Sequence, residues 1–398
     1  MGAVSRRSLL AFVAVAAVLL TAAGIAGAVF IGDGRPDPPP QLRALGLESC
    51  RALEGEEARA CLAQRFRRVL DGRDDPRPGV QAIADYAWDE GGFLLANCHV
   101  VMHTVGRTYA RDSDVTLATL MDHLPLSNDP GCSAGFAHGL VTGVAPDLNP
   151  SRPAESASVC ADAGTRWQRY SCVHGFGHAF MRLYGDELEP ALELCVELGA
   201  GTAPDCAQGA YHDYWLAAMC ADGATLRGRP VTDPRRLCAG QPEAFVRACW
   251  YRGFLETRPD GFQTEAPRDL EDLCEGLDGV QREGCIAGAS VIGPPDPAAQ
   301  LDLCADLASV RDAASCVRGT KVQNLLKEPP GTYERLITGC ARFAVAARPA
   351  CYRWLGKALT VVTDGRFART GCPALESDAA RHCAEGARTV EEPLETFS

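Results

Sequence analysis

The chain has 398 residues, of which 46% are hydrophobic and 23% are charged, and its formal charge at pH 7 is −12. This length is enough to bury a sizeable core in one large domain or two. The acidic balance argues against a nucleic-acid-binding protein, because such proteins need a basic face.

The N-terminus carries an uncharged, apolar run from Ser8 to Ile31, preceded by Arg6 and Arg7. This run is long enough to span a bilayer. It predicts either an uncleaved signal anchor over residues 1–31, or a signal peptide cut after Ala28 that would leave a secreted protein. We favour the anchor, with its N-terminus inside and the bulk of the chain extracytoplasmic. Residues 32–45 are rich in proline and predict a stiff tether.

Cysteine usage is unusually high, with 19 residues and no Cys-x2-Cys spacing anywhere. Zinc ribbons, thioredoxin-type dithiols and covalent haem attachment all need that close spacing. The cysteines therefore predict disulfides in an oxidising compartment.

Sixteen of the cysteines form eight pairs separated by 11 or 12 positions: 50/61, 160/172, 195/206, 238/249, 274/285, 304/316, 340/351 and 372/383. Around Cys195 and Cys206, apolar residues at helical spacing end at a glycine, and a turn leads into a second helix. Each pair is thus expected to join the end of one helix to the start of the next. We predict an all-α, curved, solenoid-like array of disulfide-stapled helical hairpins.

Pairing in this way leaves Cys98, Cys132 and Cys220 over. Cys98 and Cys132 take the place of the second cysteine in their units, so they are expected to bridge to each other and to leave Cys220 as the odd thiol. Any of the three is alternatively a soft metal ligand.

Six of the eight histidines follow a duplicated pattern. His99 and His103 are followed by Arg107 and Tyr109, and the same spacing recurs 75 residues later in the second copy, at His174, His178, Arg182 and Tyr184. Single histidines from the next hairpins, His138 and His212, are 74 residues apart. The duplication divides the mature chain into a histidine-bearing repeat region over 46–225 and a second repeat region over 226–398.

The spacing suits transition-metal binding. Histidines at i and i+4 project from one helical face and can hold a single ion, and a neighbouring helix is close enough to add a third imidazole. The expected sites are His99, His103 and His138, and then His174, His178 and His212. Equivalent helices of an open solenoid would lie about 20 Å apart, using about 10 Å per packed hairpin, so a shared two-metal centre needs strong curvature.

Two three-histidine sets resemble, in ligand count, those of type-3 copper proteins such as tyrosinases and haemocyanins. Copper, zinc and iron all suit such ligands, whereas haem held by two histidines is the weaker expectation. Arg107 and Arg182 are candidates for holding a small anion or a carboxylate, and Tyr109, Tyr184 and Asp213 are candidates for supporting the metal ligands.

Two alternatives remain open from the sequence. The histidines are either metal ligands, with or without a metal-dependent enzyme activity, or packing residues of a metal-free scaffold that presents a surface to a protein or a glycan. No catalytic signature in the chain chooses a reaction class.

Overall fold

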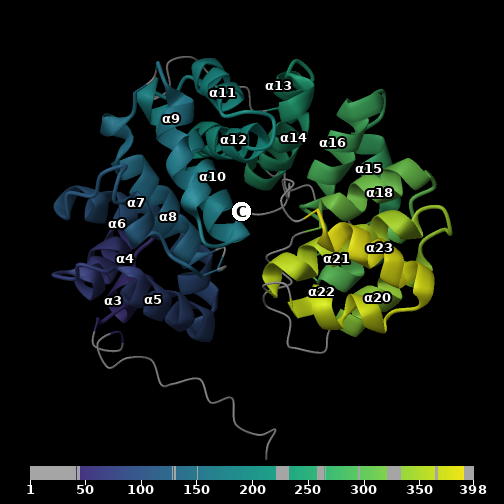
Figure 1. Cartoon of the computed structure of the whole chain (residues 1–398), viewed down its shortest axis with the longest axis horizontal. Coiled ribbons are helices and arrows are strands. Elements are labelled where there is room, and N and C mark those ends of the chain that lie inside the picture. Colours follow the sequence, from purple (N-terminus) through teal and green to yellow (C-terminus); the bar gives the residue numbers. More distant parts are fainter. Residues whose placement is uncertain are drawn as a thin grey trace, which may run out of the picture. The chain divides into compact units, whose positions relative to one another are not determined.

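The computed structural model describes residues 42, 45–127, 129, 131–149, 151–220, 233–257, 264, 266–294, 296–320, 333–363 and 366–389. This part of the chain is helical and contains no strand (Figure 1). The prediction of an all-α fold is therefore confirmed. The expected boundary between residues 225 and 226 falls outside the described residues, and that division stays a prediction.

The histidine-bearing region comprises the elements from α3 to α12. They are α3 (Glu48–Arg51), α4 (Gly55–Leu70), α5 (Arg77–Glu90), α6 (Gly92–Asp112), α7 (Leu120–His123), α8 (Cys132–Gly143), η1 (Ala145–Asp147), α9 (Pro153–Ala157), η2 (Ser158–Asp162), α10 (Arg166–Leu183), α11 (Leu188–Glu197) and α12 (Ala203–Cys220).

The later region continues the same alternation of a short and a longer helix. Its elements are α13 (Pro234–Cys238), α14 (Glu243–Thr257), α15 (Pro267–Leu273), α16 (Gly279–Ser290), α17 (Pro297–Ala305), α18 (Val310–Arg318), α20 (Tyr333–Arg342), α21 (Arg348–Val362), α22 (Arg366–Thr370), η4 (Cys372–Ala374) and α23 (Ser377–Ala387).

Disulfides connect the helices in the predicted way. All eight predicted pairs are bonded, and Cys98 of α6 is bonded to Cys132 of α8. Cys195 of α11 and Cys206 of α12, for example, lie 5.5 Å apart between Cα atoms. Cys220 ends α12, and its side chain lies outside the described part. This number of disulfides indicates an oxidising environment, either extracytoplasmic or secreted.

The longer helices of successive hairpins pack on one another. Contacts run from α4 to α6 and on through α8, α10, α12, α14, α16 and α18 to α21 and α23. Aromatic side chains at these contacts, such as Phe136, Phe176 and Trp250, are fully buried. The result is a continuous core that no single hairpin could form alone.

Close helix contacts depend on the glycine three positions after the second cysteine of a unit. A Cβ atom at Gly135 would collide with the carbonyl oxygen of His99, and one at Gly209 would collide with that of His174. These glycines therefore let α8 approach α6, and α12 approach α10, backbone against backbone. The close approach brings the histidine-bearing faces of each pair of helices together.

No helix in the described ranges combines the length and the apolar character that a membrane span requires. The expected signal anchor over residues 1–31 lies outside the described residues, as does most of the expected tether over residues 32–45.

Candidate metal centre

Four helices supply the six histidines of the duplicated motif. His99 and His103 lie on α6, His138 on α8, His174 and His178 on α10, and His212 on α12. Asp129 fixes the start of α8, because its carboxylate accepts hydrogen bonds from the backbone N–H groups of Gly131 at 3.1 Å and Ser133 at 2.7 Å. The Thr165 hydroxyl caps α10 by accepting from the N–H of Gln168 at 3.0 Å.

All six imidazoles meet in one place, and we call them the histidine cluster. The ring centroids of His103 and His178, from the two copies of the motif, are only 4.9 Å apart. Those of His138 and His174 are 4.4 Å apart. The two histidine sets therefore meet at one centre, which the sequence allows only in a strongly curved array. Because α8 packs directly on α10, the two sets face one another across that helix contact.

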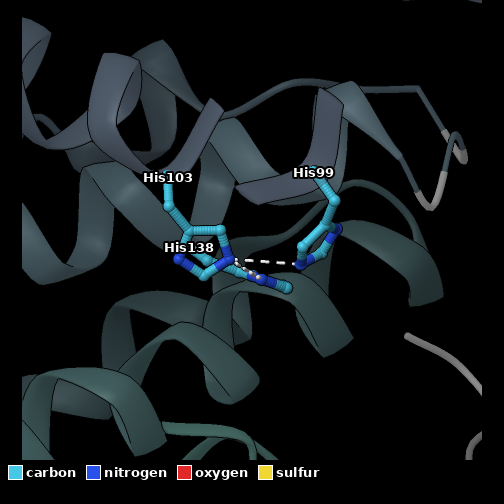
Figure 2. Close-up of side chains that lie close together, drawn as sticks. All are labelled: His99, His103 and His138. Carbon is cyan, nitrogen blue, oxygen red and sulfur yellow. Dashed lines mark hydrogen bonds between the residues drawn. The ribbon is translucent and has the colours of Figure 1, made fainter. Parts of the chain in front are cut away.

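The first predicted set lies as a compact group (Figure 2). Nε2 of His103 is 3.1 Å from Nε2 of His99 and 3.3 Å from Nδ1 of His138. Two nitrogen ligands bound to one tetrahedral ion at about 2.0–2.1 Å would lie roughly 3.3 Å apart. One nitrogen from each of the three residues lies within 4.8 Å of the others, so this group could hold a metal ion.

The second group differs in one member from the predicted set. The residues that offer nitrogens within 4.8 Å of one another are His138, His174 and His178. His212 lies beside them, with its ring centroid 5.0 Å from that of His178. His138 therefore belongs to both groups and lies between the two copies of the motif.

Burial sets the charge of the cluster. His138 and His174 have no exposed surface, and His178 and His212 are nearly as buried. Removal from water lowers the pKa of His103, His138, His174 and His212 well below the ordinary value of 6.5, and positive charge on neighbouring histidines or arginines lowers it further. These four imidazoles are neutral at pH 7, which is the form that binds a metal.

Several ring nitrogens have no hydrogen-bond partner in the described part of the chain, although they are buried. They are Nε2 of His138 and His174, both ring nitrogens of His178, and Nδ1 of His212, although Nδ1 of His178 has the Asp213 carboxylate 2.9 Å away. Each buried polar atom without a partner costs on the order of 1–3 kcal/mol. Histidines that served only for packing would leave these atoms unsatisfied, whereas a metal ion would use their lone pairs.

The second copy of the motif has polar partners around its histidines. Oδ1 of Asp213 lies 2.9 Å from Nδ1 of His178, the hydroxyl of Tyr170 lies 3.1 Å from Nδ1 of His174, and Oε1 of Glu256 lies 3.6 Å from Nε2 of His212. Burial alone would raise the pKa of the Asp213 carboxyl, but His178, Arg182 and Arg107 together bring it below the ordinary value of 3.8. Asp213 is thus a carboxylate.

Sequence reasoning found Asp213 but missed Tyr170 and Glu256. Neither residue has an equivalent in the first copy, where Leu95 occupies the position 75 residues before Tyr170. Glu256 is on α14, in a unit that lacks the histidine motif. The buried guanidinium of Arg252 lies 3.2 Å from the Glu256 carboxylate, which sets Glu256 in place beside the cluster.

Arg107 and Arg182 lie at the open side of the cluster. A cavity of about 150 Å³ is lined by both arginines, by Asp213 and by three of the histidines, His103, His178 and His212. Nε of Arg182 lies 3.6 Å from Oδ2 of Asp213. The duplicated arginines are thus brought together at one opening, as the histidines are brought together beneath it.

The two predicted tyrosines lie elsewhere. The hydroxyl of Tyr109 is 3.1 Å from the carbonyl oxygens of both Arg73 and Asp74, so it fixes the loop after α4. Tyr184 caps the end of α10 and packs partly buried against the core. Neither residue lines the cavity at the cluster, and their support of the metal ligands stays a prediction.

A larger cavity, of about 680 Å³, lies beside α7 and η2. Its titratable lining residues are Asp122, Glu155 and Asp162, and it contains no histidine or arginine. We therefore place the candidate site at the histidine cluster, where several kinds of reactive group converge.

No protein-family model, curated protein or solved structure matches this chain. The likeness to type-3 copper proteins therefore remains one of ligand count, and the assignment of the site depends on its geometry.

Proposed function

We propose that this protein binds a pair of transition-metal ions through the histidine cluster, in an oxidising extracytoplasmic or secreted setting. The observation that carries the proposal is the convergence of six imidazoles from four helices, with five of their buried nitrogens lacking any hydrogen-bond partner among the described residues. Imidazole nitrogens favour copper, zinc and iron, the metals expected from the sequence.

Two ions fit the cluster better than one. Six imidazoles exceed the four ligands of a tetrahedral ion, and the nitrogens form two groups that share His138. Because a neutral imidazole offers one lone pair, His138 would bind one ion, and His212 beside the second group would give the other ion its third ligand. Three protein ligands for each ion leave one position open, which is the usual condition of a catalytic site. The cavity bounded by Arg107 and Arg182 gives that position access from outside the cluster.

Haem fits this place poorly. The cavity at the cluster is about 150 Å³, whereas pockets for drug-sized ligands measure roughly 300–1,000 Å³. The facing histidines are also packed ring against ring, which leaves no slot for a macrocycle between them.

The experiment is elemental analysis of the purified full chain, followed by titration of the metal-free protein with Cu²⁺, Zn²⁺ and Fe²⁺. We expect two equivalents of one metal. His103→Ala and His174→Ala, one from each group, should each lose metal, while the control His382→Ala on α23 should keep both equivalents. A wild-type protein that takes up no metal, with stability unchanged by His103→Ala, would overturn the proposal and favour the metal-free scaffold.

The signal anchor is a separate proposal, because residues 1–31 lie outside the described part. It is supported by the uncharged run from Ser8 to Ile31. Expression of the full chain and of a chain beginning at Leu45, which retains every described disulfide, tests it. The full chain should fractionate with membranes and resist a salt wash, and recovery of the full-length chain in the soluble fraction would exclude the anchor.

A further inference from the structure

Two cavities lined by arginines lie at the open side of the histidine cluster, and their charge indicates what kind of ligand could reach it. Two cavities adjoin there, because both are lined by Arg107, Thr142 and Arg182. The inner one touches the histidines, and the outer one, of about 350 Å³, is also bounded by Arg111. Three arginines thus surround one approach to the cluster.

Positive charge exceeds negative charge along this approach. Among the residues that the structure describes, no carboxylate forms an ion pair with Arg107 or Arg111, and Asp213 is the single acidic side chain that lines either cavity. Asp213 is already engaged by His178 and Arg182. The whole chain, in contrast, has a formal charge of −12, so the basic lining is a local feature.

Such an arrangement is costly unless something compensates for it. Burial lowers the pKa of Arg107, and the like charges of Arg182 and Arg111 lower it further. Like charges held together in a partly dry cavity repel strongly. Bound metal ions would add more positive charge next to them. A small anion in the cavity would offset both the repulsion among the arginines and the repulsion between the arginines and the metal ions.

We propose that the two adjoining cavities bind a small anionic substrate, with Arg107 and Arg182 holding its charged oxygens and its far end directed at the histidine cluster. This inference rests on the proposed metal function, because the anion would be a substrate only if the histidine cluster holds metal ions that act on it. Guanidinium groups match carboxylate and phosphate oxygens in a fork geometry. The inner cavity has room for only a few heavy atoms beyond the charged group, which restricts the ligand to small carboxylates or phosphates.

The metal and the anion should strengthen each other's binding. A cation at His103 or His178 lies beside the cavity that the anion would occupy, and coupling between two binding equilibria is reciprocal. Malonate or phosphate should therefore bind the metal-loaded protein more tightly than the metal-free protein. Added salt should weaken the binding of either anion to either form of the protein, because the approach is open to solvent and its charges are screened.

The test is calorimetric titration of the full chain with malonate and with inorganic phosphate, using uncharged malonamide as the ligand control. We expect Arg107→Gln and Arg182→Gln each to weaken binding by about tenfold, since hydrogen bonds between charged groups are strong ones. The matched control Arg369→Gln, an exposed arginine on α22, should bind as the wild type does. Tighter binding of malonate than of phosphate would identify a carboxylate site, and tighter binding of phosphate would identify a phosphate site.

Metal content, measured on the same samples, separates the two proposals. A protein that holds metal but binds neither anion, or binds them equally well after Arg107→Gln, overturns the substrate inference and leaves the metal proposal standing. A protein that binds an anion through these arginines but never takes up metal overturns the metal proposal, and with it the role of the anion as a substrate.

Discussion

Oδ1 of Asp213 lies 2.9 Å from Nδ1 of His178, a ligand candidate of the histidine cluster. A proton held on Nδ1 by this carboxylate leaves the lone pair of Nε2 free, and Nε2 of His178 is buried without a hydrogen-bond partner in the described chain. Carboxylate–histidine pairs of this kind orient metal ligands and increase their basicity. The same carboxylate also reaches Arg182 at 3.6 Å, so it connects the two parts of the site.

Asp213→Asn should therefore lower metal affinity by about 10- to 100-fold, the usual effect of removing such a partner. The amide keeps the shape but loses the charge that holds the proton on Nδ1. Competition with a chelator of known affinity measures the change. The exposed Asp147→Asn serves as the control, and equal metal retention in the two variants would show that Asp213 does not support His178.

The pair formed by Arg252 and Glu256 is buried beside the cluster, with side-chain exposures of 1% and 15%. Removing one partner of a buried ion pair costs on the order of 3–5 kcal/mol, because the other charge stays uncompensated, while replacing both with apolar residues is often neutral. Glu256→Leu should therefore destabilise the metal-free chain strongly. Arg252→Met combined with Glu256→Leu should recover most of that loss in a urea titration. A double variant as unstable as Glu256→Leu alone would show that the pair contributes through other contacts.

Cysteine spacing made much of the fold predictable. A separation of 11 or 12 positions fits a helix end, a turn and a helix start, so the eight pairs and their hairpins could be derived from local geometry alone. The bridge between Cys98 and Cys132 could be inferred by elimination, because each of them stands in the place of a second cysteine whose partner is missing. The glycines at positions such as Gly135 indicated close helix contacts for a similarly local reason.

Convergence of the six histidines was harder to predict. The sequence gives the face of each helix that carries an imidazole, but the angle between successive hairpins comes from packing along α6, α8, α10 and α12. An open array would have separated His103 from His178, and the observed 4.9 Å depends on how α8 packs on α10. Glu256 could not be predicted, because it comes from a unit without the motif and reaches the cluster only through the contact between α12 and α14.

Asp205 predicts a pH dependence of stability away from the histidines. Its side chain is buried beside Arg166 at 3.2 Å, and burial raises its pKa to about 6, although Arg166 opposes the shift. The folded state therefore binds a proton more tightly than the unfolded state, whose carboxyl has an ordinary pKa of 3.8. This contribution is fully present below the unfolded pKa and is lost as the pH rises through the folded pKa.

Stability measured by urea unfolding should thus fall across the window from about pH 4 to pH 6 by an amount that Asp205→Asn removes. The comparison is the difference between wild type and variant at each pH, which cancels the titration of the other carboxyls. Asp147→Asn, which changes an exposed carboxyl, should leave the wild-type slope intact. A slope that survives in Asp205→Asn would mean that Asp205 is already ionised throughout this window in the folded chain.

The disulfide between Cys98 and Cys132 should matter for metal binding as well as for stability. It joins α6 to α8 one residue from His99, with a sequence separation of 34. In the chain-entropy model, removing it costs about 4 kcal/mol, against about 3 kcal/mol for a bridge with a separation of 11. Cys98→Ala combined with Cys132→Ala should also weaken the first histidine group, because α6 and α8 supply its three ligands.

Cys372→Ala combined with Cys383→Ala is the matched control, since that bridge has a separation of 11 and joins η4 to α23, which carry none of the six histidines. We expect both double variants to lose stability in thermal unfolding, but only the first to lose metal in elemental analysis. If both keep two equivalents, the glycine-mediated contact of Gly135 with the His99 backbone is sufficient to hold α6 and α8 in register, and the bridge contributes stability alone.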